Sequence, residues 1–570
     1  MLILLLNWLF IFITTYAIGY GGLQLLNKVF SLDGNLRLHP ALMSLSGLAM
    51  ITTAANYVSL FSRISLAFLI GLSLLSMLSL LLNWKNIKNS FSGIKLKNIH
   101  PLTVFFGVAF LIIAFIKSSG PTEIWDEGQY FLPLIRWIET YPAIPGTALF
   151  HDRMGYNSAF HMSSAVYSFA FWFKGGLYDL NSFLFILINF YFLSGINRIL
   201  KKNFNYPLHD YLMLFACIAL YRQLLTSMDS DYPHVFIGLV LLLLFIEKSD
   251  DYSLKKWDIR AVIILLLSFY LVTVKFLAVY FFLFLGVMLY FQLRQRKLKT
   301  IGAAVITGFL FILPWLVRNV ILTGYLVYPV YQFDFFNVDW KIPLEMARNN
   351  FLYVGEHAKT LVERHTLYYD GATNVPVSVW LPEWWNHHAT INISAVITAI
   401  VFPPTIIVLL ILLATKFKIM ARENIGHIVA IVITMIFLIF WFFQYPNVRF
   451  GWAWILFAIV FTLVKTNEQL LRIPWKMIRI VTMILFSLSL FRGTWKSVKE
   501  ADHVMEFLVS PHEVTQLTNY TTKQIGPYEV SMALDMHCWG QTPPCMPSYY
   551  DPLKIVPRGK DIKAGFKLEK

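Results

Sequence analysis

The chain of 570 residues is 57% hydrophobic and 16% aromatic, whereas only 14% of its residues are charged. Soluble domains carry about 25% charged residues and disordered chains are poor in apolar residues, so this composition excludes both classes. The 47 Lys and Arg against 32 Asp and Glu give a formal charge of +15. These basic residues are dispersed over short loops, which argues against a nucleic-acid partner.

Apolar runs close to the ~20 residues needed to cross a bilayer recur along the whole chain. They predict an all-α polytopic membrane protein with about 14 transmembrane helices. The expected spans are roughly 2–27, 40–58, 63–83, 102–118, 181–199, 208–223, 233–247, 259–274, 276–292, 301–318, 393–415, 427–443, 451–466 and 476–492.

Six loops in this layout are rich in Lys and Arg, and each alternates with a loop that carries almost none. Because positively charged loops stay in the cytoplasm, the pattern predicts an inner (cytoplasmic) membrane protein with both termini on the external, periplasmic side. The first apolar run is expected to be a span and not a cleaved signal peptide. The basic loops contain Lys85/Lys88/Lys95/Lys97, Arg198/Lys201/Lys202, Lys248/Lys255/Lys256/Arg260, Arg294/Arg296/Lys297/Lys299, Lys416/Lys418/Arg422 and Lys465/Arg472/Lys476.

The same layout predicts three parts of the chain. Residues 1–100 hold the first three helices, residues 101–492 form the transmembrane core, and residues 493–570 form an external tail. Two long loops of the core, 119–180 and 319–392, also fall on the external side. Long loops in compact proteins usually have a function, so the chemistry is expected on this side.

One apolar segment, residues 158–173, does not fit as a span, because counting it would invert every later loop. We expect a re-entrant or interfacial helix there, with Asn157 or Ser158 as its N-cap.

Asp126 and Glu127 follow a span directly and precede an amphipathic stretch. Apolar residues at Tyr130, Leu134 and Ile138 recur at helical spacing, so this stretch is expected to lie flat on the membrane interface.

Two interpretations of Asp126 stay open. Together with Gln129, three residues later, it approximates a capping box at a helix start. A carboxylate at a membrane boundary can also act as a general base when its pKa suits the task. The two roles are compatible.

Several charged residues stand at the expected external ends of spans: Asp229, Asp231, Lys275, Arg318 and Arg449. A charge in lipid is costly, so such residues usually face a polar cavity or a partner. A cavity lined in this way suits a phosphate at the level of the headgroups, because Arg binds phosphate with two N–H groups. Snorkelling to the interface is the alternative for each basic residue.

The tail contains Cys538 and Cys545, which we expect to form a disulfide in an oxidising compartment. Cys217 lies within an apolar run and is expected to be buried. His387 and His388 are adjacent and therefore point in different directions on a helix, so no metal site is predicted.

The first external loop resembles that of the GT-C superfamily, integral-membrane glycosyltransferases that use lipid-phosphate sugar donors. The likeness rests on a span followed by Asp126-Glu127-Gly-Gln-Tyr130, an interfacial helix, a loop with Gly146 and Arg153, and a second juxtamembrane helix. Within the superfamily the chain looks like the aminoarabinose-transferase and protein-mannosyltransferase type, although its first three spans are additional to a typical core.

From about residue 102 onward the chain resembles more closely an uncharacterised family of large bacterial membrane proteins. The residues that carry this second likeness are Gly155-Tyr-Asn-Ser158, Pro314-Trp-Leu-Val-Arg318-Asn319, Thr323-Gly-Tyr325, Arg449-Phe450, Cys538-Trp and Pro544-Cys545.

The GT-C resemblance implies transfer of a sugar from a polyprenyl-phosphate donor, held in the lipid bilayer, to an envelope glycan, lipid or protein acceptor, with inversion at the anomeric carbon. Only Asp126 is carried over by position, as the catalytic base. No cofactor is expected, but a second carboxylate and an ion site cannot be assigned, so a divalent cation stays open. We expect contacts with substrate from Glu127, Arg153, Asp231, Lys275, Arg318 and Arg449.

Three alternatives remain. The first is a transporter or flippase of a lipid-linked or anionic glycan, a class that commonly shows internal repeats or paired broken helices. The second is a polysaccharide polymerase or ligase with a diphosphate donor, and the third is a scaffold that docks through the tail. Long loops on one face only favour the transferase.

Overall fold

The computed structural model describes residues 2–32, 36, 38–92, 98–120, 124–173, 175–201, 207–218, 225–360, 376–388, 393–499, 501 and 518–569. Twelve helices within these ranges are long and apolar enough to cross a membrane. They are α1 (Leu2–Val29), α2 (Pro40–Ser59), α3 (Leu66–Ser92), α4 (Pro101–Ser118), α7 (Leu180–Leu200), α9 (Asp231–Asp250), α11 (Phe282–Arg294) with the 3-10 helix Phe276–Phe281 before it, α12 (Leu298–Thr323), α16 (Phe402–Glu423) with the π-helix Ile397–Val401 before it, α17 (Ile425–Gln444), α18 (Val448–Thr466) with the π-helix Asn467–Leu471 after it, and α19 (Trp475–Lys499).

The helical, multi-pass architecture predicted from the sequence is therefore confirmed, whereas the number of 14 spans stays a prediction. The two remaining expected spans coincide with shorter helices, α8 (Pro207–Ile218) and α10 (Ile259–Val274). Residues 219–224 of the first of these spans lie outside the described residues. At 16 residues, α10 is about 24 Å long, less than the ~30 Å hydrocarbon core.

Polar N-cap residues mark the start of helices α2 and α4. Both α2 and α4 begin with a His-Pro pair, in which the Nδ1 atoms of His39 and His100 accept the N–H groups of Ala41 and Leu102. Proline suits the first helical position because it brings no amide hydrogen that needs a partner. Local capping thus contributes to where the apolar runs begin.

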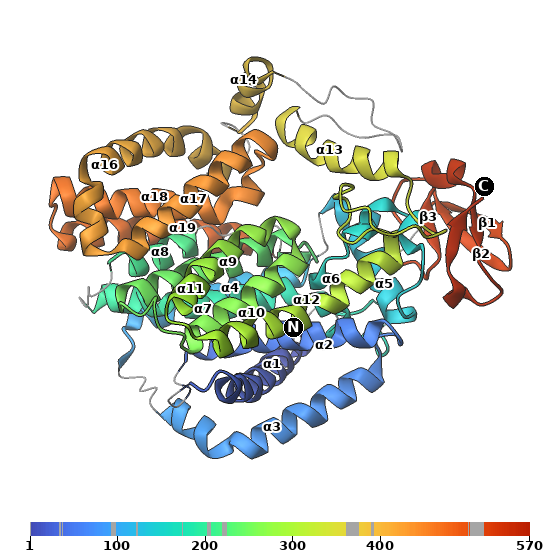
Figure 1. Cartoon of the computed structure of the whole chain (residues 1–570), viewed down its shortest axis with the longest axis horizontal. Helices are drawn as coiled ribbons and strands as arrows, with labels where there is room; N and C mark the ends of the chain where they lie inside the picture. Colours follow the sequence, from blue (N-terminus) through green and yellow to red (C-terminus); the bar gives the residue numbers. More distant parts are fainter. Residues whose placement is uncertain are drawn as a thin grey trace.

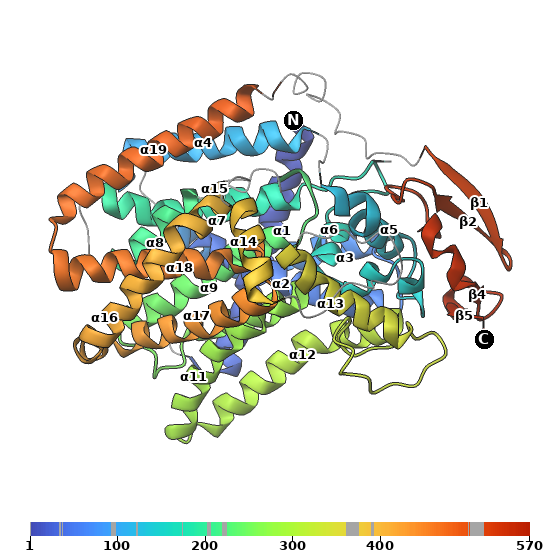
Figure 2. The ribbon, with the colours of Figure 1, turned by 90° about the horizontal axis from the view of Figure 1, so that it is seen from above.

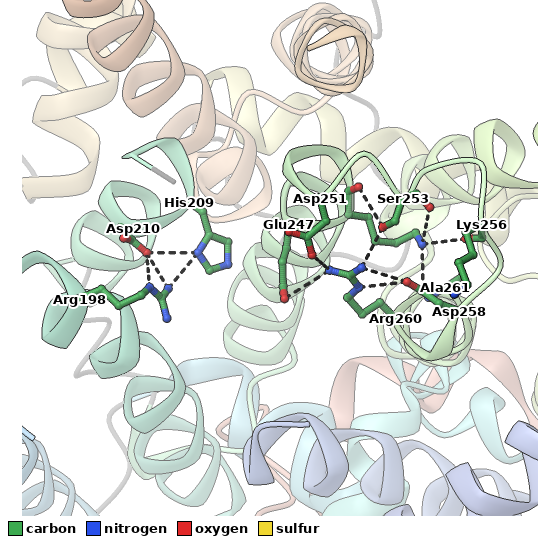
Figure 3. Close-up of polar contacts among 11 residues, drawn as sticks. Arg198, His209, Asp210, Glu247, Asp251, Ser253, Lys256, Asp258, Arg260 and Ala261 are labelled. Carbon is green, nitrogen blue, oxygen red and sulfur yellow. Dashed lines mark hydrogen bonds and ion pairs between the residues drawn. The ribbon is translucent and has the colours of Figure 1, made fainter. Parts of the chain in front are cut away.

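One end of the bundle carries ion pairs from the Lys- and Arg-rich loops (Figure 3). Arg198 at the end of α7 pairs with Asp210 of α8 at 2.6 Å, and Arg260 of α10 pairs with Asp258 at 3.1 Å. The Lys248 side chain is fully buried and donates to the same Asp258 at 2.8 Å. Several of the basic residues that indicated membrane orientation therefore also hold helix ends together.

Two further contacts bring other basic loops to this end. Asn424, between α16 and α17, donates to Asp250 at 3.2 Å, and the Gln295 side chain after α11 donates to the carbonyl of Lys255 at 2.9 Å. These loops therefore gather at one end, as the alternating charge pattern predicts. Of the predicted basic residues, Lys95, Lys97 and Lys202 lie outside the described residues.

The opposite end carries short helices. In Figures 1 and 2, α12 runs toward α13 and toward the strands at the right of the view. The elements of this end are the π-helix Glu127–Phe131, α5 (Leu132–Thr140), the 3-10 helices Thr147–Leu149 and Asp152–Tyr156, α6 (Ala159–Val166), α13 (Leu344–Thr360), α14 (Val377–His388) and α15 (Ile393–Val396).

The expected non-spanning segment after residue 158 forms α6, which has only eight residues and is buried along its whole length. Ser158 is its N-cap, with the Oγ atom accepting the N–H of Phe160 at 3.3 Å. The helix predicted to lie on the interface is α5, but Leu134, Ile135 and Ile138 are buried in protein and α5 packs on α6. The apolar face of α5 is therefore covered by protein, and its place on the membrane interface stays a prediction.

The tail contains β-structure that the sequence analysis did not predict. Strands β1 (Tyr520–Ile525) and β2 (Tyr528–Ala533) form an antiparallel hairpin, and β3 (Cys545–Pro547) pairs with β2 in parallel. A second sheet pairs β4 (Ile555–Pro557) with β5 (Phe566–Leu568), and the 3-10 helices Ser548–Leu553 and Ile562–Ala564 connect these elements. We call residues 518–569 the C-terminal unit.

Helices α1 and α2 cross so closely that only glycine fits at the contact. A Cβ atom on Gly47 would lie 1.8 Å from the carbonyl oxygen of Thr15, and one on Gly19 would lie 1.9 Å from that of Met43. Backbone cannot move aside as a flexible side chain can. The contact therefore depends on the absence of side chains at these two positions.

We expect Gly47→Ala to lower the stability of the folded protein by about 1 to 3 kcal/mol, because the added methyl group forces α1 and α2 apart. The measurement is the thermal unfolding midpoint in detergent. Gly71→Ala is the matched control, since a Cβ there meets no atom within 4 Å. Equal midpoints for the two variants would contradict the steric interpretation.

Candidate functional site

Asp126 does not cap a helix. Its backbone is already helical (φ −62°, ψ −18°) at the start of the π-helix, and its side chain makes no capping hydrogen bond. The carboxylate instead accepts a hydrogen bond from Nη1 of Arg153 at 3.1 Å, and the hydroxyl of Tyr130 lies 3.5 Å from Oδ2. The capping-box prediction was therefore wrong, and the side chain is held in an ion pair.

Arg153 is placed by a tight 3-10 helix. His151 caps this helix, with Nδ1 accepting the N–H of Arg153 at 3.2 Å. The guanidinium carbon lies 5.8 Å from the ring centre of Tyr130 and 5.5 Å from that of Tyr353 on α13. Burial lowers the pKa of Arg153, but the adjacent Asp126 carboxylate raises it, and the resulting pKa lies well above the usual value. The cation therefore stays charged beside Asp126.

A second ion-paired group joins α9, α10 and α18. Asp231 opens α9 and is buried, and its N–H donates to Oδ1 of Asp229 at 2.6 Å. Lys275, directly after α10, donates to Oδ1 of Asp231, while Nε of Arg449 on α18 lies 3.3 Å from Oδ2. The Phe450 ring covers both cations, with Nζ of Lys275 at 4.0 Å from its centre.

The two groups form one electrostatic unit. Lys275 interacts electrostatically with Asp126, Asp229 and Arg449, and Asp229 interacts with Asp126, Lys275 and Arg449. Burial raises the pKa of Asp229, while Arg449 and Lys275 act against that rise. We use the term polar cluster for Asp126, Arg153, Asp229, Asp231, Lys275 and Arg449. Three carboxylates and three cations make it formally neutral.

The polar cluster is accessible on one side. The exposed fraction of the side chain is 40% for Arg449, 23% for Asp126 and for Lys275, but only 5% for Asp231. The structure gives the two terminal nitrogens of Arg449 no hydrogen-bond partner among the described residues. The carboxylate of Asp126 and the incompletely paired guanidinium of Arg449 are therefore both accessible.

A family assignment accompanies this geometry. The sequence model of a domain of unknown function, DUF8201, matches residues 1–456. The chain belongs to the DUF8201 family. No curated protein and no solved structure matches it. The matched region includes every residue of the polar cluster, whereas the C-terminal unit lies outside it.

In this DUF8201 protein, Arg318 does not join the polar cluster. It is buried on α12 and bonds neutral partners, with Nε donating to Oδ1 of Asn157 at 2.9 Å and Nη1 donating to Oγ of Ser59 at 3.1 Å. Asn157 also donates to Oδ1 of Asn319 at 2.8 Å. The contacts of Arg318 thus anchor the turn between Arg153 and α6, and its expected contact with substrate finds no support.

Glu127 bonds the residue next to the polar cluster. Its carboxylate is buried and accepts the backbone N–H of Met228 at 3.4 Å. It also acts electrostatically on Tyr178, which donates to Glu139 at 3.2 Å. The geometry therefore fits a residue that ties the first external loop to the start of α9 better than one that contacts substrate.

The second external loop flanks the polar cluster. Tyr156 donates to Asn350 of α13 at 2.7 Å, and the indole N–H of Trp384 on α14 donates to the carbonyl of Pro446 at 2.6 Å, three residues before Arg449. Residues 361–375 and 389–392 of this loop lie outside the described residues. Both long loops expected to be functional thus meet at this end.

Sequence reasoning missed several members of this environment. Asp229 was visible as a charge before a span but was not assigned to the site, although its spacing of two residues from Asp231 favours a local backbone bond. Tyr353 carried no signal of its own and Phe450 was noted only as part of Arg449-Phe450, because aromatic residues are common near bilayer interfaces. Their role as neighbours of Arg153 and Lys275 depends on helix packing.

The cysteines follow the prediction. Cys538 and Cys545 form a disulfide within the C-terminal unit, and Cys217 is a buried free thiol. Among the described residues, no group of three or more His, Cys, Asp or Glu side chains is arranged to hold a metal ion.

We expect Asp231→Asn to destabilise this protein by about 2 to 3 kcal/mol, because Lys275 and Arg449 lose their shared carboxylate. Removing one partner of a fully buried pair costs about 3 to 5 kcal/mol, and the solvent access of both cations reduces that value. Thermal unfolding in detergent measures the loss. The double variant Asp231→Asn/Lys275→Met should recover part of it, and no recovery would contradict the pairing.

Proposed function

We propose that the protein is a membrane glycosyltransferase that moves a sugar from a polyprenyl-phosphate donor to an envelope glycan, lipid or protein acceptor, with Asp126 as the general base. The observation that supports this proposal is the accessible carboxylate of Asp126 in one polar cluster with Lys275 and Arg449. The resemblance of the first external loop to GT-C enzymes points to the same chemistry.

The ion pair with Arg153 suits Asp126 for proton transfer. Arg153 binds Oδ1 at 3.1 Å, whereas Oδ2 has only the longer contact of 3.5 Å with the Tyr130 hydroxyl, so we assign the proton of the acceptor hydroxyl to Oδ2. In the proposed step, the acceptor O–H proton passes to Asp126 and the acceptor oxygen forms a bond to the anomeric carbon. The bond from that carbon to the phosphate oxygen breaks, and polyprenyl phosphate leaves. Attack opposite the leaving group inverts the anomeric configuration.

In the proposed mechanism, the cations stabilise the negative charge on the leaving phosphate. The polar cluster is formally neutral without a ligand, so an anion must bind to a cation that still has N–H groups without a partner. Arg449 is that group, because Asp231 engages only its Nε. Lys275 adds positive potential from the side of Asp231. Preorganised donors at a developing charge are typically worth about 3 to 4 kcal/mol of barrier.

The proposal places the polar cluster on the external side of the inner membrane, opposite the end that carries the basic loops. We expect a fusion of alkaline phosphatase to the C-terminus to be active and a fusion of green fluorescent protein to be dark, because the first folds only outside the cytoplasm and the second does not fluoresce after export in unfolded form. A fluorescent C-terminal fusion would move the polar cluster to the cytoplasmic side and contradict the mechanism.

We expect Asp126→Asn to abolish sugar transfer and Arg449→Ala to reduce it by about a hundredfold or more, because the first removes the base and the second removes the phosphate contact. The measurement is incorporation of radiolabelled sugar from polyprenyl-phosphate sugar in membranes that contain each variant in equal amount.

Asp334→Asn is the matched control for this assay. It also removes one carboxylate, from a half-exposed residue that pairs with Lys341 in the second external loop, and should leave transfer unchanged. Equal transfer by all variants would remove Asp126 from the mechanism. Movement of an intact lipid-linked glycan across the bilayer without a new glycosidic bond would instead identify a flippase.

A further inference from the structure

The C-terminal unit contacts the chain on both sides of Asp126. The N–H of Trp539 donates to the carbonyl of Gly128 at 3.0 Å, and the Trp539 ring lies so close to Gly128 that a Cβ there would be 2.7 Å from it. The ring of His537 lies 4.2 Å from that of Trp125. The residues one before and two after Asp126 therefore both contact the C-terminal unit, which leaves Trp125 exposed and buries Gly128.

The same unit also forms hydrogen bonds with the loop that carries Arg153. The hydroxyl of Tyr550 donates to Oδ1 of Asp152 at 2.5 Å and accepts the backbone N–H of Asp152 at 3.0 Å. Its ring lies 5.2 Å from that of His151, which caps the 3-10 helix bearing Arg153. Tyr550 is buried, so the exchange of two hydrogen bonds takes place away from solvent.

These two contacts come from one small, cross-linked body. Trp539 directly follows Cys538, and Tyr550 lies three residues after β3, which begins at the other cysteine, Cys545. Strand β3 pairs with β2 in the same sheet. A movement of one contact is thereby transmitted to the other.

A third contact completes the docking. The N–H of Phe566 donates to the carbonyl of Pro145 at 2.9 Å, and its ring packs edge-to-face on Phe150 at 4.8 Å. Gly146 has a positive φ of 76°, and a Cβ there would lie 2.3 Å from the carbonyl oxygen of Phe566. The first external loop is shaped to fit this surface.

We propose that Trp539 and Tyr550 are positioning residues that hold Asp126 and Arg153 at ion-pair distance from outside the bundle. Twenty-seven residues separate the two partners along the chain. Trp539 fixes the segment of one partner and Tyr550 fixes the segment of the other. The proposal rests on the proposed function for the chemical role of the pair, but the docking itself can be measured without any activity.

The first test is hydrogen exchange of the full-length protein in detergent, followed by mass spectrometry. In Tyr550→Phe the backbone N–H of Asp152 loses its acceptor, so peptides covering residues 151–156 should exchange about tenfold faster. Tyr520→Phe is the matched control, since Tyr520 is an exposed residue of β1 in the same unit. Equal exchange in these two variants would overturn the proposal.

The second test measures sugar transfer and separates positioning from binding. Because a misplacement of about 1 Å can cost on the order of a hundredfold in rate, Tyr550→Phe should lower kcat by about ten- to a hundredfold and leave the KM for the polyprenyl-phosphate donor unchanged. Tyr520→Phe should match the parent. A rise in KM with unchanged kcat would overturn the positioning role.

Gly128→Ala changes the same contact at its partner in the first external loop and leaves the sequence of the C-terminal unit unchanged. The added methyl group should displace the Trp539 ring, raise exchange in residues 125–131 and lower kcat in the same way. If the parent protein transfers no sugar, the proposed function fails. The hydrogen exchange measured for the Tyr550→Phe and Gly128→Ala variants still decides whether the C-terminal unit holds this loop.

Discussion

This end of the bundle depends on the ion pairs of Asp231. Asp231 opens α9, and its carboxylate contacts Lys275 at the end of α10 and lies 3.3 Å from Nε of Arg449 on α18. The start of α9, the end of α10 and the start of α18 therefore meet at one level. A charge buried in this way is stable only when it is paired, so the contacts that stabilise the helix ends also bring Lys275 and Asp229 into electrostatic interaction with Asp126.

Hydrogen bonds also join the first external loop to these spans, since Glu127 accepts the N–H of Met228 at 3.4 Å and Ser158 donates to the carbonyl of Val274, directly before Lys275, at 2.8 Å. Asp126 belongs to the first external loop, whereas Lys275 and Arg449 belong to spans, yet Asp126 lies within the electrostatic environment of Lys275. Arg318 shows the contrast. Although it also stands near the end of a span, its partners are Asn157 and Ser59, so it shapes the loop and contributes little to the charge balance of the polar cluster.

Much of the helical layout could be predicted from the sequence, because apolar runs and alternating basic loops are local signals. The convergence of Asp126, Lys275 and Arg449 at one end also followed from that layout. The ion pair with Arg153 could not be predicted, since it depends on the turn ended by Asn157, whose φ of 44° is unusual for a residue other than glycine. Strands of three residues such as β3 leave no periodic pattern, whereas β1 and β2 have six residues each and their hairpin was not predicted.

The position of the C-terminal unit in the chain has a consequence for biosynthesis. Asp152 and Tyr550 are 398 residues apart, so a ribosome completes every span of the bundle before it makes the partner of Asp152. Until Tyr550 has reached the first external loop and the disulfide between Cys538 and Cys545 has formed, this loop lacks its contacts with the C-terminal unit. A truncated or reduced chain would therefore reach the bilayer inserted but unfinished, and the order of synthesis itself would delay assembly of the site.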